Sequence, residues 1–500
     1  MASLVVDRAW DEADSPLVSR PVQFSVLLAV VFRYGLLFLP YGLAVLLRMA
    51  PSTSYLVAWG GSFWILYLTL SGTVKPLPGG QSLARQLFRP IGLTQLMFAG
   101  YTALTSIFYF LDVQGYFYLW HNPMSAVPPR EVALAAEAQR YYVLGHAAFA
   151  TGVLLAMDYR RSGEWSLQTR IRWPWFLLYL AGGLFVGAQV LNVVPGLGQV
   201  QGRLETLGFV ASVVSLAVSI MKGNKTLLAA SGGVYGINLV LALLSGWKSE
   251  VLVAFILLAV FLYPAYRRTI TVVAPAVLIV LLAILPTYAH VMRSLSWQGN
   301  VEAETAAQIA LDQVLSDRTA LARTNWQFLT GRLSEIGMFT EYIDYVPGER
   351  PYYKFELVEH GLIGIVPRAF WSGKPSMERL ASERVYAAGI VNQGMAVSAK
   401  TKYVVDAYLS GGPLGVFLGL LLYGLMASWA SRLAERWFGG YLLGSGLVYT
   451  ALFKIFWLSS AFEFFFNTVF WSFMVMGALF VGGRMTGFLV RTPQKERVPA

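Results

Sequence analysis

Long apolar segments recur along almost the whole chain, separated by short polar turns. Segments of about 17–24 apolar residues are long enough to cross a bilayer as helices. They occur at 24–47, 55–71, 91–111, 141–157, 174–194, 206–221, 227–244, 251–265, 270–288, 413–430, 441–459 and 467–483. The pattern predicts an all-α polytopic membrane bundle of about twelve transmembrane helices.

One polar segment, residues 290–412, interrupts the apolar pattern. The predicted organisation is therefore an N-terminal tail (1–23), a first group of transmembrane helices (24–289), a large loop (290–412), a last group of transmembrane helices (413–483) and a C-terminal tail (484–500). Met1–Arg20 is acidic and has no basic segment leading into a short apolar core, so we expect a cytosolic tail and not a cleaved signal.

The large loop has a helical pattern of its own. Apolar spacing predicts an amphipathic helix over 302–324 and a helical continuation over 325–345, which Pro347 and Gly348 end. The short apolar segment 355–366 is expected to lie against the membrane surface. We therefore expect a mainly helical loop that caps the bundle.

Basic residues are distributed unequally between alternate loops. One set contains Lys75, Arg85, Arg89, Arg160, Arg161, Arg170, Arg172, Lys222, Lys225, Arg267, Arg268, Arg432, Arg436, Arg484, Arg491, Lys495 and Arg497. The short loops of the other set contain only Arg48, Arg130, Arg140, Arg203 and Lys248. Because cytoplasmic loops are enriched in Lys and Arg, both termini are expected in the cytoplasm and the large loop outside it.

Composition narrows the possible functions. Of 500 residues, 56% are hydrophobic and 13% charged, against about 25% charged in soluble proteins. The net charge of +11 lies mostly at helix ends, which argues against a nucleic-acid partner. The chain has no cysteine, which excludes disulfides and thiol nucleophiles. Familiar metal and nucleotide motifs are absent and the four histidines are scattered, so we expect no metal and no cofactor.

Charged residues inside or beside apolar segments are candidates for function because they are costly there. Arg33 suggests a buried ion pair or hydrogen bonds to carbonyls. Lys454 and Glu463 suggest an ion pair, with a lysine that extends to the interface as the alternative. Lys248 lies in a short turn on the same predicted face as the large loop, which favours a functional role.

Two cations of the large loop have rigid and aromatic neighbours. Arg368 and Lys374 lie in a stretch that reads Val-Pro-Arg-Ala-Phe-Trp-Ser-Gly-Lys-Pro over residues 366–375. Prolines restrict the backbone and aromatic residues favour burial, so both cations are expected to be held in place for an anion such as a diphosphate. The alternative is a surface turn with two solvated cations.

This stretch resembles the Pro-Arg…Trp…Lys-Pro signature of the Wzy-type oligosaccharide repeat-unit polymerases, which make O-antigen and exopolysaccharide. Residues 245–249 resemble the Gly-x-Arg-Ser turn of that family, with Lys248 in place of arginine. Residues 406–415 resemble its Glu-x-Tyr…Gly-x-x-Gly segment, with Asp406 in place of glutamate, and residues 329–334 resemble an Arg-x-Ser segment. The resemblance covers about 245–415 and the predicted topology.

The resemblance implies polymerisation of undecaprenyl-diphosphate-linked oligosaccharide repeat units at the outer face of the bacterial inner membrane. Donor and acceptor would both be lipid-linked, and a chain-length regulator or flippase would be a further partner. Cations would stabilise the leaving diphosphate without a metal. The implied catalytic residues are Arg332, Arg368, Lys374, Lys248 and Asp406, and the implied substrate-binding residues are Arg293, Glu341, Trp371 and His360.

Several assignments stay open at this point. Asp406, Glu341, Glu335 and His360 are alternative general bases for the acceptor hydroxyl. The aromatic residues of the large loop suit either sugar stacking or core packing. An O-antigen ligase or related lipid-linked sugar transferase is a second candidate function. A lipid-linked glycan transporter is a third, although it would favour charges inside the bundle and small loops.

Overall fold

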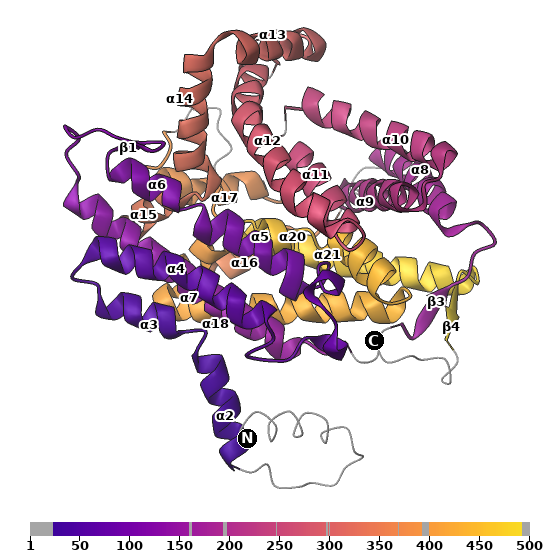
Figure 1. The fold of residues 1–500 in the computed structure, drawn as a ribbon, viewed down its shortest axis with the longest axis horizontal. Coiled ribbons are helices and arrows are strands. Elements are labelled where there is room, and N and C mark those ends of the chain that lie inside the picture. Colours follow the sequence, from indigo (N-terminus) through magenta and orange to yellow (C-terminus); the bar gives the residue numbers. More distant parts are fainter. Residues whose placement is uncertain are drawn as a thin grey trace.

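The computed structural model describes residues 24–159, 163–193, 198–246, 248–296, 299, 301–368, 370–392 and 400–492. The expected N-terminal tail, 1–23, lies outside the described residues. The described chain is mostly helical, as the hydrophobic pattern predicts (Figure 1).

The elements before the large loop are α2 (Phe24–Gly35), α3 (Leu39–Leu46), α4 (Pro51–Leu70), η1 (Pro78–Gly80), η2 (Leu83–Arg85), η3 (Pro90–Thr94), α5 (Gln95–Phe98), η4 (Ala99–Leu104), α6 (Ile107–Val113), β1 (Tyr116–Phe117), β2 (Trp120–His121), α7 (Pro129–Ala156), β3 (Trp165–Leu167), α8 (Trp173–Asn192), α9 (Gly198–Lys222), α10 (Lys225–Leu244), α11 (Lys248–Leu262) and α12 (Arg267–Ser296). They are followed by α13 (Ala303–Ser316), α14 (Arg318–Phe328), η5 (Leu329–Leu333), α15 (Ile336–Tyr345), α16 (Glu356–Ile365), α17 (Met377–Ala387), α18 (Tyr403–Trp437), η6 (Tyr441–Tyr449), α19 (Thr450–Leu452), α20 (Ile455–Leu458), α21 (Phe462–Met485) and β4 (Leu489–Arg491).

Among the described residues, 7 helices are long and apolar enough to cross a membrane, or 8 if the bent pair α2–α3 forms one span. The helices are Pro90–Val113, Trp173–Leu191, Gly198–Lys222, Lys225–Leu244, Arg267–Ser296, Tyr403–Trp437 and Phe462–Met485. Shorter apolar helices cover Ser249–Leu262 and Tyr441–Leu452. This set is compatible with a multi-pass membrane protein. The larger number of spans that we expect from hydropathy stays a prediction.

The centre of the fold is the packing of α7 against α18, which lie side by side in Figure 1. A Cβ atom added at Gly152 would come within 2.2 Å of the Leu421 carbonyl oxygen, and one at Gly424 within 2.2 Å of the Phe149 carbonyl oxygen. Small residues at the crossing of two helices let their backbones approach closely. These two glycines therefore set the distance between the helices.

Helix α18 begins at Tyr403, inside the segment expected to belong to the loop. Its backbone departs from helical geometry at Gly411 and at Gly412, which has φ of +61°, and Pro413 follows. A positive φ is readily adopted by glycine, and a proline removes one helical hydrogen bond. Residues 403–410 therefore form a short helical segment of their own before the break, and this segment contains Asp406.

The large loop forms five α-helices and one π-helical segment within its described residues. Asp317 divides the expected helix over 302–324, because its carboxylate accepts the Ala320 N–H at 2.9 Å and starts α14. Helices α13 and α14 pack on α12, α15 packs on α7, and α16 and α17 pack on α21. The loop is thus packed against the bundle along its length.

Two short antiparallel sheets connect distant segments. Strands β1 and β2 form a hairpin whose aromatic residues Phe117 and Tyr118 lie against Trp326 of α14. Strands β3 and β4 pair Trp165–Leu167 with Leu489–Arg491. The first hairpin thereby joins the N-terminal half of the chain to the large loop.

Candidate functional site

Arg293 and Arg332 come together from two different elements. Arg293 lies in the last turn of α12, and its Nε donates a hydrogen bond to the Gly246 carbonyl at 3.0 Å. Arg332 lies in the π-helical segment η5, is exposed, and is close enough for its positive charge to act on the Arg293 guanidinium. Two cations that the sequence singles out separately therefore act on each other through their charges.

The turn between α10 and α11 completes this group. Gly246 has φ of +69°, and an added Cβ there would lie 3.3 Å from the Arg293 Cγ atom. Glycine thus permits both the turn and the close approach of the arginine. Lys248 starts α11 directly after this turn, but its side chain lies outside the described part of the structure.

Buried hydrogen bonds hold α14, and hence η5, against α12. The Asn325 side chain donates to the Ala283 carbonyl, and the Thr287 hydroxyl donates to the Asn325 Oδ1 atom at 3.3 Å. The Thr330 hydroxyl donates to the Trp326 carbonyl at 3.0 Å within the same turn. Because satisfied buried polar groups favour one arrangement, these contacts position Arg332 relative to Arg293.

Lys402 contacts the C-terminal end of η5. Its Nζ donates to the carbonyls of Ser334 at 2.9 Å, Leu333 at 3.4 Å and Tyr101 at 3.3 Å. Burial lowers the pKa of Lys402 to about 8, although nearby Glu335 acts in the opposite direction. Lys402 therefore joins the end of η5 to the start of α18, a role that sequence reasoning missed.

Of the two cations in the turn from Arg368 to Lys374, only Lys374 is fixed by buried hydrogen bonds. Lys374 is buried, and its Nζ donates to the carbonyls of Gly364 and Val366, both at 2.7 Å, at the C-terminal end of α16. Burial and the charge of Arg368 both lower the pKa of Lys374. Lys374 thus caps a helix, as cations at C-terminal ends commonly do.

Arg368 itself is exposed. Of the aromatic residues that were expected to bury this turn, Phe370 is 85% exposed and Trp371 is 40% exposed. The expectation that aromatic neighbours hold both cations is therefore wrong for Arg368. The arginine and Trp371 are therefore accessible to a ligand.

Asp406 lies in a buried ion network instead of an open site. Its Oδ1 accepts the Thr401 hydroxyl at 2.7 Å, and its Oδ2 accepts Arg384 Nη2 at 2.9 Å and the Phe462 N–H at 2.8 Å. The side chain is fully buried. Because both oxygens are hydrogen-bonded and shielded from solvent, this arrangement does not suit proton abstraction from a sugar hydroxyl.

Arg384 of α17 is the centre of that network. It forms a bidentate ion pair with Glu463 of α21, with Nη1–Oε1 at 2.6 Å and Nη2–Oε2 at 2.9 Å. Burial alone would lower the pKa of Arg384, but the Asp406 and Glu463 carboxylates outweigh it and raise the pKa above its ordinary value. The network connects the large loop to α18 and α21.

The expected pair between Lys454 and Glu463 is wrong. Lys454 lies 3.9 Å from Glu250, while Glu463 is bonded to Arg384. Glu463 is an acid at the start of an apolar helix, which is a sequence signal for a buried partner. Arg384 has no comparable signal, because it lies among other charges of the loop.

The remaining predicted residues lie at the edges of these groups. His360 of α16 is 21% exposed, and its Nδ1 atom lies 3.7 Å from Glu463 Oε1. Glu341 is exposed on α15, next to the buried Tyr342. Neither joins the Arg293–Arg332 pair by a contact between described side chains.

Comparison with known proteins gives a family but no described relative. No curated protein and no solved structure matches the chain. The model of one family, described as a domain of unknown function (DUF8712), matches residues 39–491. This match includes the candidate membrane-spanning helices, the large loop and the ion networks described above, so the chain belongs to the DUF8712 family.

Proposed function

We propose that this protein polymerises undecaprenyl-diphosphate-linked oligosaccharide repeat units into a surface polysaccharide by metal-independent glycosyl transfer. The observation that carries the proposal is that the charge of the exposed Arg332 acts on Arg293, which is bonded to the Gly246 carbonyl. Two nearby guanidinium groups repel each other, which favours the binding of an anion with more than one charge.

A diphosphate leaving group suits such a pair. Negative charge grows on the leaving oxygen as the glycosidic bond breaks, and fixed cations stabilise it more in the transition state than in the bound substrate. Arginine binds phosphate oxygens through two parallel hydrogen bonds. Arg332 is exposed and hence accessible to such a ligand, while Arg293 is anchored to the Gly246 carbonyl.

The acceptor hydroxyl also needs a base. Asp406 is buried and already hydrogen-bonded to Thr401 and Arg384. In our proposal the general base is therefore Glu341, which is exposed on α15. Arg368 and Trp371 are accessible on the turn after α16 and would contact the glycan, because aromatic faces and cations suit sugar rings and their acidic groups. Lys374 would support that turn from within.

The proposal places the protein in the bacterial inner membrane with both termini in the cytoplasm. Its support is the excess of Lys and Arg in alternate loops. The large loop, with Arg332, Arg368 and Glu341, would then face outward. The lipid part of both substrates would remain in the outer leaflet.

The test uses a deletion strain that carries the wild-type or variant chain on a plasmid, with the surface glycan separated on a gel. Arg332→Ala is expected to abolish long polymer while the protein remains inserted. Arg318→Ala, an exposed arginine at the start of α14, is the matched control and is expected to keep the wild-type ladder.

The form of the product distinguishes the alternatives. Single repeat units capped on the acceptor lipid support a polymerase. Full polymer that stays on undecaprenyl diphosphate supports a ligase instead, and lipid-linked units retained on the inner leaflet support a transporter. An unchanged ladder in both Arg332→Ala and Arg293→Ala would refute the proposed site.

A further inference from the structure

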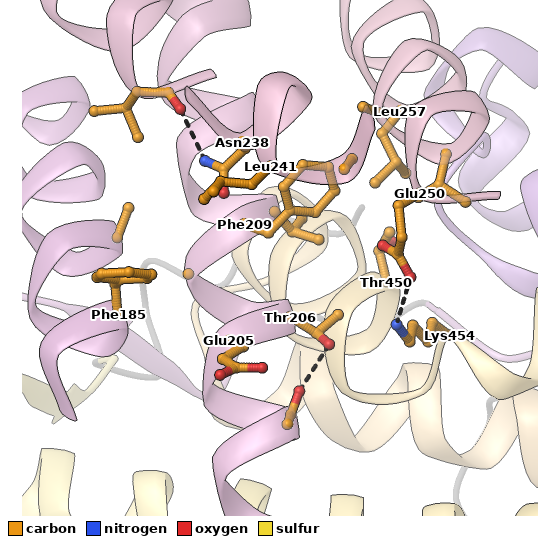
Figure 2. A pocket seen from close by; sticks show the side chains of 18 of the residues that line it. Phe185, Glu205, Thr206, Phe209, Asn238, Leu241, Glu250, Leu257, Thr450 and Lys454 are labelled. Carbon is orange, nitrogen blue, oxygen red and sulfur yellow. Dashed lines mark hydrogen bonds and ion pairs between the residues drawn. The ribbon is translucent and has the colours of Figure 1, made fainter. Parts of the chain in front are cut away.

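A cavity of about 690 Å³ lies among α8, α9, α10, α11 and the short helices α19 and α20 (Figure 2). Its volume is within the range of about 300–1,000 Å³ found for small-molecule sites. In the described structure, none of the residues predicted as catalytic or substrate-binding lines it. It therefore needs an explanation of its own.

The cavity has an apolar side that is open to the surroundings of the bundle. Phe185, Ile237 and Leu241 line it and are 52%, 63% and 51% exposed. They lie on α8 and α10, two of the helices that are able to cross a membrane. In a bilayer such exposed apolar side chains contact lipid chains, so a lipid chain has lateral access to the cavity.

Most polar groups on the wall are already satisfied by their own helices or loops. The Thr206 hydroxyl donates to the Gly202 carbonyl at 2.8 Å, and the Asn238 amide donates to the Val234 carbonyl at 2.9 Å. The Thr450 hydroxyl donates to the Ser445 carbonyl at 2.8 Å. A ligand therefore meets a largely apolar wall, with Phe209 and Leu257 directed toward the same space in Figure 2.

Two cations on the wall, Arg203 and Lys454, have N–H groups that can still donate a hydrogen bond to a ligand. Arg203 donates from Nη2 to the Thr468 hydroxyl at 3.0 Å, while its buried Nε has no hydrogen-bond partner among the described residues. Lys454 lies 3.9 Å from Glu250, which is longer than a hydrogen bond. Both cations could therefore bind an acceptor oxygen without losing a short contact.

The charges on the wall balance. Arg203 and Lys454 are matched by Glu205 and Glu250, and Glu205 accepts a hydrogen bond from Gln201 at 2.9 Å. A phosphate alone, or a diphosphate, would leave the cavity with excess negative charge. A headgroup that carries both a phosphate and an ammonium group would leave it neutral, which lowers the cost of burial.

The charged residues also lie at a suitable depth. Glu250 is in the first turn of α11, Arg203 lies near the start of α9, and Lys454 directly precedes α20. Ends of membrane helices lie near the headgroup region, and their middle parts lie among the chains. The charged residues of the cavity thus lie at the depth of the lipid headgroups, and its apolar residues lie at the depth of the lipid acyl chains.

We propose that this cavity binds one membrane phospholipid with a zwitterionic headgroup. Its phosphate lies between Arg203 and Lys454, its ammonium group lies at Glu250, and one chain follows the apolar wall past Phe209. This site is separate from the glycosyl-transfer site and does not rest on the proposed function.

The test uses the full-length protein, stripped of lipid in detergent and titrated with phosphatidylethanolamine or phosphatidylglycerol under native mass spectrometry. The wild type is expected to bind one phosphatidylethanolamine about tenfold more tightly than phosphatidylglycerol. Gly182→Leu adds a side chain to the cavity lining and is expected to weaken binding by at least about tenfold. Gly183→Leu is the matched control. Gly183 is adjacent in sequence and also has space for a side chain, but it does not line the cavity.

Two charge variants test the headgroup assignment and do not depend on filling the cavity. Arg203→Gln is expected to weaken binding of both lipids. Glu250→Gln removes one carboxylate and is expected to shift the preference toward phosphatidylglycerol. Equal binding by Gly182→Leu and Gly183→Leu, a wild-type preference for phosphatidylglycerol, or an unchanged preference in Glu250→Gln would each overturn the proposal.

Discussion

Arg384 and Glu463 form a buried bidentate ion pair that joins α17 of the large loop to α21 of the membrane bundle. Asp406 binds the same guanidinium, so one cation forms ion pairs with carboxylates from both α18 and α21. The loop is therefore attached to the bundle by charge as well as by apolar packing.

Removal of Arg384 should destabilise this attachment severely. In Arg384→Met, two buried carboxylates lose their cation, and the loss of one partner of a buried ion pair costs about 3–5 kcal/mol. Thermal unfolding of the purified protein should show a large decrease in the transition temperature. Arg379→Met, an exposed arginine on the same helix, should change stability by less than about 0.5 kcal/mol; similar losses in both variants would contradict this role.

The close crossing of α7 and α18 should not tolerate a larger residue. In Gly152→Leu the new side chain would enter the backbone of α18, because even a Cβ atom comes within 2.2 Å of the Leu421 carbonyl oxygen. We expect loss of a monodisperse folded protein in size-exclusion chromatography. Gly183→Leu, which meets open space, should remain folded, and normal folding of Gly152→Leu would show that the crossing distance is wrong.

Lys402 should make stability depend on pH in the alkaline range. Its pKa is about 8 in the folded protein and 10.5 as the ordinary value, so between these values the unfolded chain binds more protons. The free energy of unfolding should therefore rise as the pH rises from about 8 to about 10.5, by at most about 1.4 kcal/mol per pH unit. Below pH 8 this contribution should be constant.

Chemical unfolding at several pH values measures this effect. The comparison is between the wild type and Lys402→Met, which keeps the apolar part of the side chain. The variant should lack the alkaline rise, and the difference between the two proteins should be confined to that window. An equal pH dependence in both would assign the titration to another group.

Arg293 and Arg332 should act together on the proposed glycosyl transfer. If both bind one diphosphate, the loss caused by Arg293→Ala with Arg332→Ala should be smaller than the product of the two separate losses. The rate of polymer formation from lipid-linked repeat units measures this coupling. Strictly multiplicative losses would indicate that the two arginines act at different places.

Local patterns were sufficient for some of the predictions. Runs of apolar residues indicate membrane helices because hydropathy depends only on neighbours in the sequence. The same periodicity predicts the helices of the large loop. Pro347 is predicted to end one of them, and it does follow the end of α15. The sequence also singles out Arg293 and Arg332, but it does not predict that their charges act on each other.

Local patterns along the chain predict a mostly helical fold with apolar helices and single out the candidate cations, whereas the partners of the charged residues depend on the tertiary packing. Glu463 is bonded to Arg384 and not to Lys454, and Asp406 is enclosed although its motif suggested an open site. The physical reason is the distance along the sequence over which each interaction acts. Helix formation and membrane insertion depend on local composition, but an ion pair or a cavity depends on which helices pack together, as α17 does with α21.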